Sequence, residues 1–180
     1  MMRRHFFEQN KLEYKKVLGC SLGNLCAQET DWTCSVACIR TMLSGIGNEI
    51  PSESDIVNEY SMQPGPYYSR DIKRIGILEQ YDVIYGCDLE KKSFDAVLEY
   101  MDAGYYIMLE CMYNYAHWVV LLGYYPIADD IEKSQLSIYD PYYNQVRLFC
   151  VDEFLTMWID GNYAETNVEK DFIAIKGVCK

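Results

Sequence analysis

The spacing of apolar residues changes near the middle of the chain, and this change constrains the fold more than any other feature. Before Gly104 the apolar positions recur at helical intervals; after it they form short runs rich in β-formers between turn residues. Helices are expected from about Cys34 to Ser44, from openings at Ser52, Ser69 and Ser93, and over residues 152–158. Strands are expected over residues 81–85, 105–112, 117–125, 135–139, 145–150 and 172–175. Helices followed by an antiparallel sheet predict an α+β fold, with N-terminal helices packed on a C-terminal sheet.

The length predicts a single domain. The chain has 180 residues, half of them hydrophobic, which is enough to bury a real core. No repeat, low-complexity tract or linker divides it. Residues 1–180 are therefore expected to form one domain, with an irregular N-terminal segment over residues 1–27.

The charge excludes some partners. The formal net charge is −11, and no stretch concentrates Lys and Arg on one face, so nucleic acid and anionic membrane surfaces should be repelled. A neutral or basic ligand is more compatible with this negative electrostatic potential.

The longest apolar stretch, residues 118–122, is far shorter than the roughly 20 residues of a membrane helix. No signal-peptide core follows the N-terminal arginines, so the chain is expected to be cytoplasmic. The sequence does not determine its oligomeric state.

The eight cysteines indicate neither a disulfide scaffold nor a zinc site. The chain is too large and too apolar to need disulfides, and it contains no C-x-x-C pair or other standard zinc spacing. Cys111 and Cys150 lie in apolar runs, where a free thiol serves as a small buried side chain. We therefore expect no metal and no cofactor.

One cysteine and one histidine are placed for nucleophilic chemistry. Cys34 lies where the first long helix begins, and a helix N-terminus stabilises a thiolate. The chain has two histidines; His5 lies in the terminal segment, so His117, at the start of an apolar strand, is the candidate base. Each has a structural alternative, since an isolated histidine is often a core residue and any one cysteine is often buried for packing.

Two further residues would complete such a site. Gln28, six residues before Cys34, can supply an amide donor to an oxyanion beside the Cys34 backbone N–H. Asp140 ends a predicted strand and can accept the second N–H of His117, which fixes the imidazole tautomer. Taken singly, Gln28 is an ordinary loop glutamine, and Asp140 before Pro141 is a common turn starter.

Three short blocks carry a family resemblance. They are Gln28 with the run Asp31-Trp32-Thr33-Cys34-Ser35-Val36-Ala37-Cys38-Ile39, the run of residues 117–121, and Ile138-Tyr139-Asp140-Pro141. This order of Gln, Cys, His and Asp-Pro resembles the papain-like peptidases that process bacteriocin double-glycine leaders. The resemblance implies a papain-like cysteine proteinase fold with Cys34 as nucleophile, His117 as base, Asp140 as orienting acid and Gln28 in the oxyanion hole. The chain departs from the family at Ser35, which is usually Gly, and at Thr33, which is usually acidic.

A second group with the same core is also similar. The segment from Asp140 to Asn144, continuing through Phe154 to residues 171–173, looks like the guanylyl cyclase-like domains. A cyclase reaction has little support from the residues, because the sequence shows no phosphate-binding glycine loop and no clear metal pair of carboxylates.

The main hypothesis is hydrolysis of a peptide or isopeptide bond through a thioester acyl-enzyme, with a peptide or protein as substrate. An acyltransferase is the nearest alternative, because only the second nucleophile differs. A non-catalytic peptide-binding module is the other, in which tyrosine pairs at residues 67–68 and 142–143 recognise the partner and Cys34 is incidental.

Overall fold

The structure is a computed structural model that describes residues 16–17, 25–47, 49–112, 115–127, 130–160 and 168–177. Part of the expected irregular segment is a strand: β1 (Lys16–Val17) pairs antiparallel with a later strand. Such a long-range pair leaves no local signal in the sequence, which explains why it was not predicted. Residues 1–15 and 18–24 of that segment, His5 included, lie outside the described residues.

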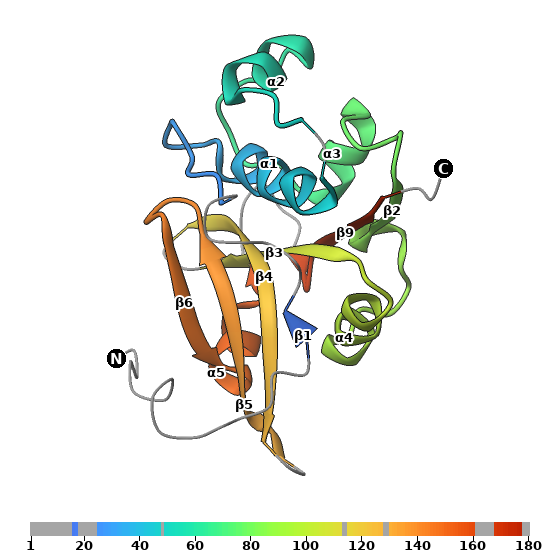
Figure 1. Ribbon diagram of the computed structural model, residues 1–180, viewed down its shortest axis with the longest axis vertical. Coiled ribbons are helices and arrows are strands. Elements are labelled where there is room, and N and C mark those ends of the chain that lie inside the picture. Colours follow the sequence, from blue (N-terminus) through green and yellow to red (C-terminus); the bar gives the residue numbers. More distant parts are fainter. Residues whose placement is uncertain are drawn as a thin grey trace.

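The helices and strands follow the predicted order (Figure 1). The helices are α1 (Cys34–Ile46), α2 (Glu53–Glu59), α3 (Ser69–Ile75), α4 (Phe94–Asp102) and α5 (Val151–Met157), with a 3₁₀ turn η2 (Gly86–Asp88). The longer strands are β2 (Asp82–Tyr85), β3 (Tyr106–Met112), β4 (Ala116–Ile127), β5 (Asp130–Asp140), β6 (Gln145–Cys150) and β9 (Phe172–Lys176). The two-residue strands β7 (Ile159–Asp160) and β8 (Val168–Glu169) form a small separate sheet that was not predicted.

The main sheet is antiparallel and divides the core into two layers. Its order is β2-β9-β3-β4-β5-β6, with β1 paired to β4. Helices α1, α2 and α3 pack on one side, and α4 and α5 pack on the other (Figure 1). Alternate residues of β3 serve the two layers: Met108 packs toward α1, while Ile107 and Leu109 face the opposite core.

Helix α1 is the central element of the first layer. Ten of its thirteen residues are buried, so it has no broad polar face and must lie between other elements. It packs against β3 and β4, and the Tyr106 hydroxyl donates a hydrogen bond of 2.7 Å to the Gly45 carbonyl oxygen. A Cβ at Gly45 would collide with the Tyr106 ring, so the close approach requires glycine. This packing fixes the N-terminus of α1 beside the start of β4.

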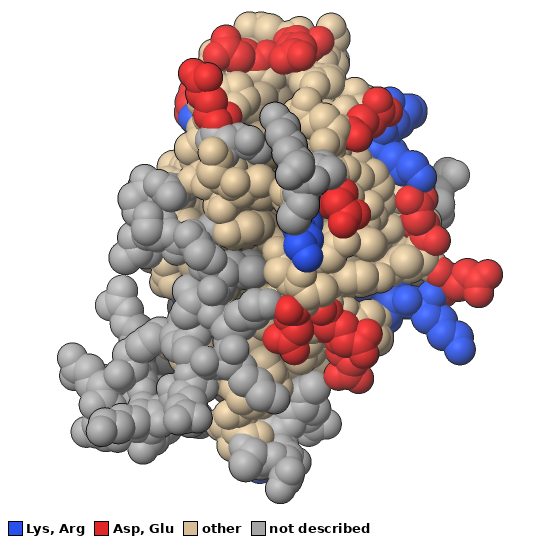
Figure 2. Space-filling view, turned by 45° about the vertical axis from the view of Figure 1, so that its right-hand side comes forward, with Lys and Arg blue, Asp and Glu red and all other residues tan. Residues whose placement is uncertain are grey.

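The helices predicted to open at Ser52 and Ser93 have these serines as N-caps, and α3 begins at Ser69 with Tyr68 as its N-cap. Ser52 and Asp55 form a reciprocal capping box at α2, and the Ser93 hydroxyl accepts from the Ala96 N–H at α4. Among the described residues no helix is long and apolar enough to cross a membrane. On the face that Figure 2 shows, acidic side chains lie in several separate groups and Lys and Arg form no broad field.

A buried carboxylate joins α3 to the sheet. Asp171, just before β9, is 1% exposed and accepts hydrogen bonds from the Ser69 backbone N–H (2.8 Å) and hydroxyl (2.6 Å). Its own backbone carbonyl accepts from Glu110 N–H and from the Trp158 indole N–H. One residue thus connects α3, β3 and the end of α5.

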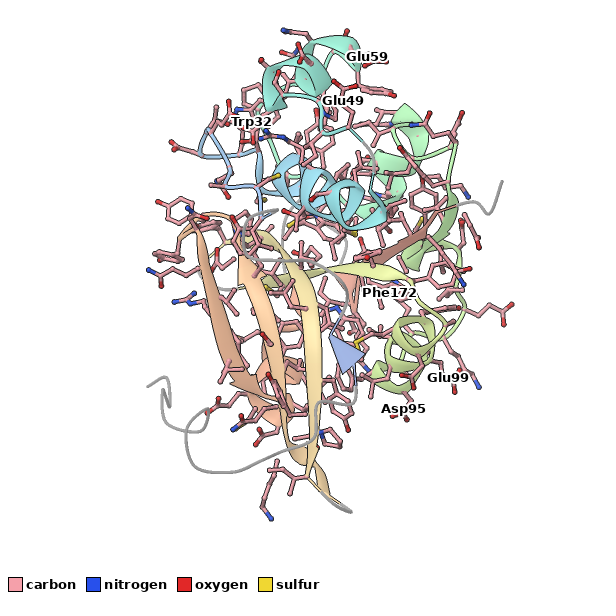
Figure 3. All side chains as sticks on the ribbon, in the orientation of Figure 1. Trp32, Glu49, Glu59, Asp95, Glu99 and Phe172 are labelled. Atoms are coloured by element: carbon pink, nitrogen blue, oxygen red, sulfur yellow. The ribbon has the colours of Figure 1, made fainter. Side chains whose placement is uncertain are left out.

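We expect Asp171→Ala to lower the free energy of unfolding by about 2–4 kcal/mol, because two buried donors of Ser69 lose their acceptor. Urea denaturation of the two proteins measures the difference. Asp95→Ala is the matched control: Asp95 is exposed in the first turn of α4 (Figure 3), and its loss should cost at most about 1 kcal/mol. Equal losses in the two variants would contradict the role of Asp171.

Candidate active site

The N-terminus of α1 carries Cys34 as its first helical residue. Thr33 is the N-cap, but its side chain makes no cap hydrogen bond; its hydroxyl is paired with the Thr30 hydroxyl at 2.9 Å instead. The first N–H groups of a helix have no intrahelical partner, and here the usual side-chain acceptor is turned away. The Cys34 side chain, 9% exposed, therefore lies at a positive helix end with open backbone donors.

The loop before α1 is fixed from both sides. The Gln28 N–H donates to the Pro141 carbonyl oxygen at 3.1 Å, and the Cys26 N–H donates to the Thr41 hydroxyl at 3.0 Å. The first bond joins the loop to the turn after β5, and the second joins it to α1. These two bonds connect the helix end that bears Cys34 to the turn that begins at Asp140.

His117 and Asp140 form a buried pair. The Nε2 atom of His117 lies 2.9 Å from Oδ1 of Asp140, and the two side chains are 3% and 1% exposed. The backbone N–H groups of Tyr142 and Tyr143 also donate to Oδ1, at 3.1 and 3.4 Å. With Nε2–H donating to Asp140, the neutral imidazole has Nδ1 as its acceptor atom. The turn that begins at Asp140 therefore fixes both the ring and its tautomer.

The electrostatics favour an imidazolium at His117. Burial alone would lower the pKa of His117, but the hydrogen bond with Asp140 and the interaction with Cys34 outweigh it and raise the pKa to about 9. Burial alone would raise the pKa of Asp140; His117, the turn N–H of Tyr143 and Arg147 hold it below its usual value instead. The pair is therefore a carboxylate and an imidazolium at neutral pH.

Cys34 is close enough to His117 to affect the imidazole. It contributes to the raised pKa of His117, although Nδ1 is buried and makes no well-aligned hydrogen bond with the described residues. Catalytic hydrogen bonds are often long or misaligned before substrate binds. The structure thus brings three of the four predicted residues, Cys34, His117 and Asp140, into one cluster.

The backbone N–H of Gln28, which donates to the Pro141 carbonyl oxygen, connects this residue to the cluster. Its side-chain Nε2 donates to the Thr30 carbonyl oxygen at 2.7 Å, and its Oε1 is buried without a hydrogen bond from the described residues. An amide nitrogen carries two donors, so one N–H remains beyond the bond to Thr30. Gln28 therefore lies in the predicted loop before α1, but its side-chain amide is hydrogen-bonded to Thr30 of the same loop.

Arg147, on β6, belongs to the cluster and was not predicted. Its Nη1 lies 2.9 Å from Oδ2 of Asp140, and its guanidinium lies over the Tyr143 ring at 4.7 Å. The only sequence signal is a single arginine inside the run Gln145–Cys150. Its contact with Asp140 depends on the β5–β6 pairing, in which Asp140 faces Gln145 and Ile138 faces Arg147.

A cavity of about 150 Å³ opens beside Cys34. Cys34 and Ser35 line one side, Gly65 to Tyr68 line another, and residues of β3 and β4 line the third. Ser35 is 2% exposed, so the side chain that replaces the usual family glycine is built into the cavity wall. The Trp118 indole N–H donates to the Tyr67 carbonyl oxygen at 2.6 Å and joins two of these walls.

The other cysteines have different surroundings. Cys38 and Cys111 are buried, and burial raises the pKa of both thiols well above the usual value. Cys150, expected to be buried, is only partly so. Among the described residues no group of three His, Cys, Asp or Glu side chains is placed to hold a metal ion.

The comparisons with known proteins bear on the fold. No protein-family model matches the sequence, and no curated protein matches it. The structure is similar to a solved structure, the peptidase domain of Streptococcus ComA, which is described as a bifunctional ABC transporter involved in a quorum-sensing pathway. The TM-score is 0.59 at 13% sequence identity, covering 85% of this chain and 98% of that domain.

This likeness defines the class of architecture. The mixed helical and antiparallel arrangement is the papain-like fold, as predicted from the sequence. At 13% identity the likeness to the ComA domain shows the shared fold, and the chemistry must be argued from this chain's own residues.

We expect the imidazole of His117 to titrate with a pKa of about 9 in the folded protein. In Asp140→Asn the pKa should fall, because burial still lowers it and the carboxylate no longer offsets this effect. NMR of the ring protons measures it, and His5→Gln assigns the second histidine signal. A His117 pKa near 6.5 in both proteins would contradict the interaction.

The same shift predicts a dependence of stability on pH. The folded-state pKa of His117 is above its ordinary value of 6.5, so the imidazolium stabilises the fold fully below about pH 6.5. This contribution is lost as the pH rises through about 9. The difference in unfolding free energy between wild type and His117→Ala should shrink over that interval.

Proposed function

We propose that this chain is a cysteine peptidase that acts through Cys34, His117 and Asp140. The observation that carries the proposal is the cluster itself: a thiol at a helix N-terminus, beside an imidazole held by a buried carboxylate. The fold shared with a peptidase domain supports the same reading. A lone cysteine or histidine is easily explained by chance. A cysteine beside a histidine that is hydrogen-bonded to a buried aspartate is not.

In the proposed reaction, the proton of Cys34 rests on Nδ1 of the His117 imidazolium before substrate binds, and Cys34 attacks the carbonyl carbon of the scissile bond as a thiolate. The oxyanion receives hydrogen bonds from the open N–H groups at the start of α1 and from the second N–H of the Gln28 amide. His117 then protonates the leaving amine, and a thioester remains on Cys34. Water, deprotonated by His117, hydrolyses the thioester, and the Cys34 thiolate leaves beside the regenerated imidazolium.

The surroundings of the cluster favour a peptide or protein substrate. Tyr142 and Tyr143 are each 47% exposed, and the Tyr142 ring lies 6.5 Å from the His117 ring. Aromatic surface beside the nucleophile can hold an extended peptide. The tyrosines that motivated the binding-module hypothesis therefore serve the same site as the catalytic cluster, and we regard binding as part of the peptidase function.

We propose a cytoplasmic location, because Cys34, Cys38, Cys87 and Cys111, in the described part of the chain, are free thiols. Acyl transfer to an amine remains the second candidate, since it uses the same thioester. The guanylyl cyclase-like resemblance receives no support from the comparisons and is not proposed.

We expect Cys34→Ala and His117→Ala each to lower kcat/KM for peptide cleavage by at least about 10³-fold. A mixture of internally quenched peptides provides the signal, and mass spectrometry of the rapidly quenched reaction should show the acyl group on Cys34. Added amines then reveal the acyltransferase, because they divert the acyl group from water.

Cys87→Ala is the matched control, since Cys87 is an exposed free thiol and should leave cleavage unchanged. Full cleavage by Cys34→Ala, or no peptide cleavage and no faster alkylation of Cys34 than of Cys87 between pH 6 and 8, would overturn the proposal.

We expect Gln28→Ala to lower kcat by about 10²–10³-fold with little change in KM, because an oxyanion donor acts mainly in the transition state. Gln80→Ala, an exposed turn glutamine, is the control. A change confined to KM, or none, would assign Gln28 a structural role in its loop.

A further inference from the structure

A buried glutamate outside the catalytic cluster joins α2 to the loop before α1. Glu53 is the first residue of α2 and is 2% exposed. Its Oε1 accepts a hydrogen bond of 3.0 Å from the Glu29 backbone N–H, and its Oε2 lies 3.9 Å from Nη1 of Arg40. Glu29 directly follows Gln28, whose amide is the proposed side-chain donor of the oxyanion hole. The proposed mechanism gives the Glu53 carboxyl group no role.

Stability alone does not account for a glutamate at this position. Burial raises the pKa of Glu53, and interactions with Thr33 and the Glu29 N–H offset this effect only in part. Replacing a buried ion pair by apolar residues of similar size often leaves stability unchanged or improves it. The favourable interaction of an acid with the start of α2 is also supplied by Asp55, which is exposed. What Glu53 adds is its bond to the loop that carries Gln28.

The tip of this loop, residues 29–31, is exposed and has few attachments to the rest of the protein. In the described part of the chain, the hydrogen bonds that join the tip to another element end at two side chains. One is Glu53, and the other is Arg40 of α1, whose Nη1 lies 3.2 Å from Oε1 of Glu29. The Glu29 side chain is 57% exposed, so this second contact is weak. The bond from the Glu29 N–H to the buried Glu53 is therefore the main attachment of the tip.

The tip in turn orients the Gln28 side chain. Nε2 of Gln28 donates to the Thr30 carbonyl oxygen at 2.7 Å, so the direction of its second N–H is set by the position of Thr30. The Gln28 backbone N–H donates to the Pro141 carbonyl oxygen at 3.1 Å. Gln28 is thus held by its backbone from the turn after β5 and by its side chain from the tip. An oxyanion donor is most effective when its position is fixed before the reaction, because no reorganisation is then needed.

We propose that Glu53 is a positioning residue for the oxyanion hole. By accepting from the Glu29 N–H, Glu53 fixes the tip, and the tip fixes the Thr30 carbonyl oxygen that orients the Gln28 amide. The inference rests on the proposed peptidase function and adds a residue to its site. Glu53 acts through Gln28 and takes no part in making or breaking bonds.

The first test removes the acceptor and keeps the size of the side chain. Glu53→Met should lower kcat for internally quenched peptides at least about tenfold with little change in KM, because an oxyanion donor acts mainly in the transition state. Glu53→Ala, which adds no new atoms, should give the same loss. Glu53→Gln keeps an oxygen that can accept from the Glu29 N–H, and its kcat should stay within about threefold of wild type. An equal loss in Glu53→Met and Glu53→Gln would overturn the inference.

A double-mutant cycle separates positioning of Gln28 from a general effect on the fold. In Gln28→Ala no side-chain amide is left to position, so adding Glu53→Met should lower kcat by no more than about threefold. The same fold-loss in both backgrounds would overturn the inference. Glu59→Met is the matched control, because it makes the same substitution at the exposed last residue of α2 (Figure 3). Its kcat should equal that of wild type.

The second test needs no turnover. Hydrogen exchange of the Gln28 side-chain amide is followed by NMR, and Gln28→Ala assigns its signal. Exchange should become at least about tenfold faster in Glu53→Met, because release of the tip opens the bond to Thr30, and it should be unchanged in Glu59→Met. An unchanged exchange rate in Glu53→Met would overturn the inference and leave the peptidase proposal standing. A wild-type protein that cleaves no peptide would overturn the peptidase proposal and this inference together.

Discussion

The Asp140 carboxylate is the group on which the arrangement of the site depends. It ends β5, begins the turn that precedes β6, and accepts from His117, from two backbone N–H groups and from Arg147. A carboxylate that is 1% exposed is tolerated only because each of its oxygens has partners. The Arg147 guanidinium and the His117 imidazolium both interact with this one carboxylate.

The position of Cys34 depends on α1, which is packed on both β3 and β4. Because most of this helix is buried, it cannot slide or rotate without losing core contacts. The sulfur is therefore carried by a rigid element, while the imidazole is carried by the start of β4 and the carboxylate by the end of β5. The bond from Gln28 N–H to the Pro141 carbonyl oxygen connects the two halves at the site.

The features that the sequence predicted correctly are those that depend on residues close together in the chain. The start of α1, the helix start at Ser52 and the strand-ending Asp140 each depend on a few neighbouring residues, so a single sequence shows them. Arg147 was missed because its contact with Asp140 depends on strand register. The engagement of the Gln28 amide by Thr30 is likewise a loop conformation that residue types do not specify.

Register also explains why the cluster of His117 and the cavity beside Cys34 lie together. In the β3–β4 pair, Cys111 faces His117 and Glu110 faces Trp118, so neighbouring residue pairs belong to the His117 cluster and to the cavity lining. The Trp118 ring is then fixed to the loop that precedes α3 through the Tyr67 carbonyl oxygen. A shift of one residue in this pairing would turn the side chains of the shifted strand to the other face of the sheet. Because the core strongly opposes such a shift, the packing that stabilises the sheet also keeps the His117 cluster and the cavity lining at fixed positions.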